Sequence, residues 1–203
     1  MLTKERLAAR IFRQLTWYFP QRKDEIFLTF DDGPTPEVTP WVLSVLKEYK
    51  ARATFFCLGE KVEQYPGLFQ QVIDEGHVVG NHSYSHLSGW NTRNQEYYKE
   101  ICKASELIHS KLFRPPYGEI TCKQIRQLKK EYHLVMWDVL SKDYDPSTLP
   151  EQCFKNVVEQ SVSGSIVVFH DNLRAWKNLY YTLPRVLQYF SDKKFTFNPI
   201  ILP

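Results

Sequence analysis

Two acidic residues at the end of an apolar run are the first candidates for chemistry in this chain of 203 residues. Asp31 and Asp32 follow the apolar stretch 26–30 and stand directly before Gly33 and Pro34. A run of this length that ends at Gly-Pro predicts a buried strand that stops abruptly. Carboxylates at the end of a buried strand are costly unless a charge or a hydrogen bond meets them, and a bound metal ion supplies one. The plainer alternative is a turn or a helix cap, where Asp is common.

Two histidines spaced four residues apart, His82 and His86, are candidate ligands for such an ion. On a helix, or in a tight loop, this spacing lets both imidazoles bind one cation. Ser83 follows His82, so the HExxH pattern of zinc peptidases is absent. Together with one carboxylate, the histidines would give three protein ligands and an open position for water, which is the composition of a catalytic metal site. A polar loop with chance histidines is the alternative.

Further polar residues stand at or near the ends of predicted strands, namely Arg114, Asp138 and His170. Taken singly, a surface arginine and a core histidine explain them. In a parallel α/β barrel, however, the carboxyl ends of the strands share one face, and that face carries the active site. The joint placement of these residues with the acid pair and the histidines therefore favours one functional site.

Apolar runs that alternate with helical patterns predict a parallel sheet covered by helices, because both faces of such strands are buried. About seven strands are expected, including a continuous one over residues 133–139 and another over 164–170. We expect a distorted (β/α)7 barrel with parallel strands and outer helices, in a single domain over residues 1–203. An open doubly wound sheet is the alternative, although no glycine-rich phosphate loop follows the first strand.

Composition excludes several classes of function. A net charge of +3 without a dense Lys/Arg block argues against a nucleic-acid partner. No apolar run is long enough to span a bilayer. The cysteines show no CxxC spacing and are expected to be reduced thiols; they are Cys57, Cys102, Cys122 and Cys153.

Residues 1–20 are predicted to form an N-terminal helical extension. Leu7, Ile11 and Leu15 recur at helical spacing, so we expect an amphipathic helix packed on the domain, with attachment to a membrane surface as the weaker option. Glu5 and several arginines interrupt any signal-peptide core, which favours a cytoplasmic location.

Five motifs occur in a fixed order and carry a family resemblance. They are TFDDGP at 29–34, HSYSH at 82–86, RPPY at 114–117, WDVLSKDYD at 137–145 and VFHD at 168–171. This set resembles the polysaccharide deacetylase (NodB-homology) family, carbohydrate esterase family four. The family fold is a distorted, incomplete (β/α) barrel, in agreement with the strand pattern.

The resemblance implies roles for the acid pair and its partners. Asp31 would be the general base, and Asp32 would bind the metal together with His82 and His86. Arg114 would hold Asp31 by a charged hydrogen bond, which favours the ionised base.

The resemblance also implies an acid and a substrate wall. His170 would protonate the leaving amine, and the backbone N–H of Tyr117 would face the developing oxyanion. Val168, at a position that is usually Leu, would line the pocket for the acetyl methyl group. Tyr144 stands where the family usually has Trp; because sugars stack on aromatic faces, we expect it to be a substrate contact, with packing in the core or at an interface as the alternative.

One position departs from the family pattern. Leu140 replaces the first acid of the fourth motif, which is expected to tune the catalytic histidine. The sequence leaves three substitutes open, namely Asp138, Asp143 and Asp171.

We therefore expect a zinc-dependent hydrolase, with cobalt as another suitable ion, that releases acetate from glycans containing N-acetylglucosamine, such as peptidoglycan or chitin-like oligosaccharides. A catalytically silent glycan-binding module is one alternative. A deacetylase for O-acetyl sugars or small amides at the same site is another. The oligomeric state is left open.

Overall fold

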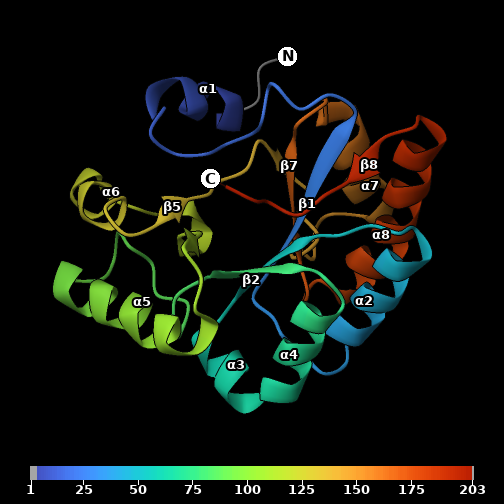
Figure 1. The fold of residues 1–203 in the computed structure, drawn as a ribbon. Helices are drawn as coiled ribbons and strands as arrows, with labels where there is room; N and C mark the ends of the chain where they lie inside the picture. Colours follow the sequence, from blue (N-terminus) through green and yellow to red (C-terminus); the bar gives the residue numbers. More distant parts are fainter. Residues whose placement is uncertain (1–3, 203) are drawn as a thin grey trace.

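The computed structural model describes residues 4–202, in which helices and strands alternate along the chain (Figure 1). The elements are α1 (Lys4–Ile11), β1 (Glu25–Asp31), α2 (Thr39–Glu48), β2 (Thr54–Cys57), α3 (Gly59–Gln64), α4 (Pro66–Asp74), β3 (Val78–Asn81), α5 (Asn94–Ile108), β4 (Leu112–Phe113), a 3-10 turn (Pro116–Gly118), α6 (Cys122–Leu128), β5 (His133–Leu134), β6 (Val139–Leu140), α7 (Pro150–Gln160), β7 (Ile166–His170), α8 (Trp176–Asp192) and β8 (Thr196–Phe197).

The strands form one parallel sheet in the order β5-β4-β3-β2-β1-β7-β6, and β8 pairs with the start of β1. The sheet curls into a half-barrel, and α2 to α8 flank it on the outside (Figure 1). This architecture confirms the predicted distorted barrel of seven parallel strands with outer helices.

Alternation along β1 sends its side chains to two different places. Ile26, Leu28 and Phe30 belong to the large core cluster that includes apolar residues of α2 and α8. Because successive side chains of a strand point to opposite faces, Thr29 and Asp31 face the other way, toward the inside of the half-barrel. The strand thereby stabilises the fold with one face and supplies polar groups with the other.

The prediction of one strand over residues 133–139 is wrong. The segment begins as β5 beside β4 and ends as β6 beside β7, so it crosses between the two edges of the sheet. The carbonyls of Val135 and Met136 accept hydrogen bonds from the side chain of Arg114, and the N–H of Met136 donates to the carbonyl of Thr16. These groups, with the N–H of Val135 that donates to Phe113 of β4, satisfy the backbone along the crossing.

The N-terminal extension is helical over α1 only, and its packing differs from the prediction. Leu7 and Ile11 are exposed, whereas Leu15 is buried as predicted, in a core cluster on which Ala8, Ala9 and Phe12 also pack. Arg6 forms an ion pair of 3.1 Å with the buried carboxylate of Asp138, which ties α1 to the half-barrel. Among the described residues, no helix has the length and apolarity needed to cross a membrane.

Candidate metal centre and catalytic cleft

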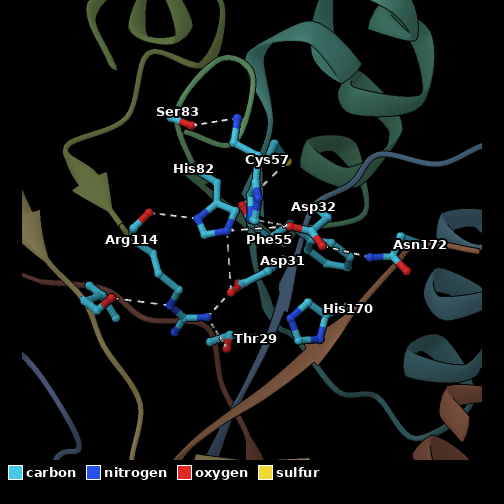
Figure 2. Close-up of polar contacts among 12 residues, drawn as sticks. Thr29, Asp31, Asp32, Phe55, Cys57, His82, Ser83, Arg114, His170 and Asn172 are labelled. Atoms are coloured by element: carbon cyan, nitrogen blue, oxygen red, sulfur yellow. Dashed lines mark hydrogen bonds and ion pairs between the residues drawn. The ribbon is translucent and has the colours of Figure 1, made fainter. Parts of the chain in front are cut away.

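Parallel strands bring the predicted site residues to one edge of the sheet. Asp31 closes β1 and His170 closes β7, and the two residues are paired in the register of these strands. Asp32 follows β1, and His82 follows β3. Figure 2 shows these side chains converging on one region.

Three side chains form a group that could hold a metal ion, namely Asp32, His82 and His86, with ligand atoms all within 4.8 Å of one another. The Oδ1 atom of Asp32 lies 3.2 Å from Nε2 of His86 and 3.6 Å from Nε2 of His82. His86 has a φ of 63°, in the left-handed region, and its backbone N–H donates to the hydroxyl of Ser83. A tight loop, and not a helix, therefore turns both imidazoles toward the carboxylate.

The protonation pattern of this group fits a divalent cation. Oδ1 of Asp32 is buried and has no hydrogen-bond partner among the described residues. Nδ1 of His82 lies 2.8 Å from the carbonyl oxygen of Arg114. Since a carbonyl only accepts, Nδ1 carries the proton and Nε2 keeps its lone pair for a ligand bond. Oδ1 of Asp32 and Nε2 of His82 are thus both available for ligand bonds, and they lie 3.6 Å from each other.

Burial and charge keep the ligands in the form that binds metal. Burial lowers the pKa of His82 to about 4, against the charges of Asp31 and Asp32, so its imidazole is neutral near pH 7. Burial raises the pKa of Asp32, but its close contact with His86 and the charge of His170 outweigh this effect. The net effect holds the pKa of Asp32 well below its ordinary value, so this carboxylate is ionised.

Asp31 is paired with a fully buried arginine. Nη1 of Arg114 lies 2.7 Å from Oδ1 of Asp31 and 2.7 Å from the hydroxyl of Thr29. The guanidinium also stacks on the ring of Phe56, with 4.1 Å from its carbon to the ring centroid. The second oxygen of Asp31 lies 3.9 Å from Nε2 of His82, on the side of the candidate metal ligands. The predicted Asp31–Arg114 contact is therefore present.

His170 is held by Asp143, one of the three acids that the sequence left open. Oδ1 of Asp143 lies 2.7 Å from Nδ1 of His170, and Oδ2 accepts the backbone N–H of the same histidine at 2.8 Å. Burial lowers the pKa of His170, but the charge and hydrogen bond of Asp143 raise it more, with a net pKa of about 9. A histidine in this environment carries a proton near neutral pH.

The other two acids have different partners. Asp138 binds Arg6, Ser165 and the N–H of Ile166, where β7 begins, so it lies at the opposite end of the strands from the site. The expectation that Asp138 belongs to the catalytic face is wrong, because the crossing of 135–138 carries it to the other end. Asp171 accepts a hydrogen bond from Thr39 at 2.5 Å and is fully buried.

A cleft of about 370 Å³ joins these groups. Its walls include all three predicted substrate contacts, Tyr117, Tyr144 and Val168, together with Leu140 and Trp137. Tyr117 has a φ of 59° and its ring meets that of His86 at a centroid distance of 4.4 Å. The ring of Tyr144 packs edge-on against His170 at 4.9 Å. The role of the Tyr117 N–H stays a prediction.

Four residues that line the cleft were not among the predicted site residues, namely Trp137, Leu140, Asn172 and Arg174, and the last two make contacts with predicted ones. Asn172 donates a hydrogen bond of 2.8 Å to Oδ2 of Asp32, and Arg174 lies over the ring of Tyr144 with 5.8 Å from its guanidinium carbon to the centroid. Both follow the end of β7 in the sequence, and this position was the available signal.

The chain matches the family model described as polysaccharide deacetylase over residues 20–137, which is more than half of its length. Two peptidoglycan-N-acetylglucosamine deacetylases of Bacillus cereus are each 37% identical to it. One alignment covers 74% of this chain and 57% of the relative, and the other covers 77% of each. The chain thus spans little more than half of the first relative.

A solved structure shares the fold over nearly the whole chain. It is the crystal structure of the Bc1960 peptidoglycan N-acetylglucosamine deacetylase in complex with 4-naphthalen-1-yl-N-oxidanyl-benzamide, with a TM-score of 0.88 and 30% identity over 95% of this chain and 94% of that one. The family model, the relatives and the site geometry agree: this chain belongs to the polysaccharide deacetylase (NodB-homology, carbohydrate esterase family four) family.

Proposed function

We propose that this protein is a metal-dependent hydrolase that removes N-acetyl groups from glycans containing N-acetylglucosamine and releases acetate. The observation that supports it most strongly is one cleft that is lined by three kinds of functional group. These are the candidate metal ligands, Asp31 with its partner Arg114, and His170 with its partner Asp143. Binding alone would not require a candidate base and a protonated acid beside the same metal centre.

The metal, when bound by Asp32, His82 and His86, would supply Lewis acidity and an activated water. Zinc is the leading candidate, since two imidazoles and one carboxylate suit it, and cobalt fits the same donors. Arg114 binds one oxygen of Asp31, and the oxygen that Arg114 leaves free is the one that lies nearer His82. That oxygen would accept the proton of the attacking water.

Proton donation would come from β7, the strand that pairs with β1. Asp143 keeps His170 protonated and fixes its ring through Nδ1, so the proton on Nε2 would pass to the departing amine. The N–H of Tyr117 would donate to the oxyanion, and Val168 would contact the acetyl methyl group. Tyr144 would face the sugar, because sugar rings pack on aromatic side chains.

The substrate class follows from the family and the relatives. The two Bacillus cereus relatives are named for N-acetylglucosamine in peptidoglycan. We propose a β-linked glycan of this kind, peptidoglycan or a chitin-like oligosaccharide, as the substrate. The silent glycan-binding module and the hydrolase for O-acetyl sugars or small amides are the competing proposals.

The test measures acetate release from acetylated chito-oligosaccharides and from peptidoglycan with zinc present, beside metal content by elemental analysis. We expect release by the wild type and none by Asp31→Asn, which should still bind metal. Asp24→Asn at the start of β1 is the matched control and should keep full activity.

Three results would contradict the proposal. Metal-dependent sugar binding by the wild type without acetate release would favour the silent module. Faster release from O-acetyl than from N-acetyl sugars would favour an esterase. Full activity and metal content in His82→Ala would exclude the proposed centre altogether.

A further inference from the structure

Asn172 connects the metal centre to the start of the last helix (Figure 2). Its Nδ2 donates to Oδ2 of Asp32 at 2.8 Å, and its Oδ1 accepts the N–H of Ala175 at 2.9 Å. Ala175 directly precedes α8, so this second bond holds the turn that leads into the helix. The carboxylate needs a donor and the N–H needs an acceptor, so the amide has one orientation only.

This contact makes the two oxygens of Asp32 unequal. Oδ2 is occupied by the amide of Asn172, whereas Oδ1 is buried, has no hydrogen-bond partner among the described residues and faces Nε2 of His82 and of His86. Without Asn172, the carboxylate would be free to rotate and to offer both oxygens.

We propose that Asn172 is a positioning residue that holds Asp32 so that Oδ1 alone is presented to the cation. The inference rests on the proposed metal centre and deepens it, because it assigns one-oxygen coordination to the carboxylate. Outer hydrogen-bond partners of metal ligands fix ligand orientation, and their loss typically weakens metal binding about 10- to 100-fold.

A purely structural role is the alternative, since the bond to Ala175 would stabilise α8 without any effect on metal. Asn172→Ser separates the two roles. A serine hydroxyl can still accept the N–H of Ala175 in this turn, but it is too short to replace the amide that reaches Asp32. Asn172→Asp also keeps an acceptor for Ala175 and preserves shape, while it removes the donor to Asp32.

The experiment measures zinc affinity by competition with a chelating dye, and the visible absorption spectrum of the cobalt-loaded protein, which reports coordination. We expect about 10-fold weaker zinc binding in Asn172→Ser. We expect a changed cobalt spectrum in both Asn172 variants, and an unchanged melting temperature of the metal-free Asn172→Ser protein.

Asn198→Ser is the matched control. In the wild type, Nδ2 of Asn198 also donates to a carboxylate, Oε2 of Glu25 at 3.1 Å, near the opposite end of β1. This variant should bind zinc like the wild type and give the same cobalt spectrum.

Two outcomes separate the inference from the function on which it rests. Wild-type zinc affinity and an unchanged cobalt spectrum in the Asn172 variants would overturn the positioning role and leave only the support of the turn before α8. A wild type that binds neither zinc nor cobalt would instead overturn the proposed metal centre itself.

Discussion

Replacing Asp143 by Asn should move the alkaline limit of the pH–rate profile for acetate release to lower pH. Asp143 contacts His170 twice, through Nδ1 and through the backbone N–H, and its charge and hydrogen bond raise the pKa of the imidazole more than the charges of Asp32 and Asp31 do. In Asp143→Asn the charge is lost, and burial then acts against the protonated ring. The pKa of His170 should fall to its ordinary value of about 6.5 or lower.

The magnitude follows from the two pKa values. With a pKa of about 9, roughly nine-tenths of His170 is protonated at pH 8. With a pKa of about 6.5, only about 3% is protonated at that pH. If His170 is the general acid, kcat/KM at pH 8 should fall by about 30-fold, which corresponds to about 2 kcal/mol, while the loss at pH 5.5 should be much smaller.

The assay is acetate release from a chito-oligosaccharide between pH 5 and 10 at saturating zinc, with circular dichroism to confirm folding. Asp145→Asn is the matched control, because the carboxylate of Asp145 binds Ser147 and makes no contact with His170 in the described structure. An alkaline limit that stays in place in Asp143→Asn would refute the assignment of His170 as the acid that Asp143 tunes.

Three further predictions concern buried groups around the cleft. Arg114→Met should lower the free energy of unfolding by about 3–5 kcal/mol in urea titrations, because the carboxylate of Asp31 loses its buried cation. The double variant with Asp31→Asn should recover part of this loss, and equal stability of the single and double variants would contradict the charge argument. Gly33→Ala should lower the free energy of unfolding by at least about 1–3 kcal/mol in the same titration, since the added methyl carbon would lie 2.0 Å from Oδ2 of Asp171. A variant as stable as the wild type would contradict this close packing. Burial raises the pKa of Asp171 to about 8, against the hydrogen bond from Thr39. Between about pH 4 and 8 the folded state therefore binds more protons at Asp171 than the unfolded state, and this group's contribution to stability falls as pH rises. Asp171→Asn removes that dependence, so its stability relative to the wild type should increase from pH 5 to pH 8, and a constant difference would contradict a protonated Asp171.

The sequence by itself determined the fold class and the main members of the site. Strands buried on both faces are continuously apolar, so a carboxylate pair after residues 26–30 and a histidine at the end of 164–170 stand out from them. Parallel pairing then places the ends of these strands at one edge, which brings Asp31 opposite His170. This much follows from local pattern and strand direction.

The tertiary structure alone decided which groups meet across the sheet. Asp138, Asp143 and Asp171 were equivalent candidates, yet only Asp143 contacts the ring of His170, because the segment 135–138 crosses the open side of the half-barrel and turns Asp138 to the opposite end. The contact of Asn172 with Asp32 spans 140 residues of sequence. Such contacts depend on the path of the backbone and on the direction of each side chain, and no spacing within a motif encodes either.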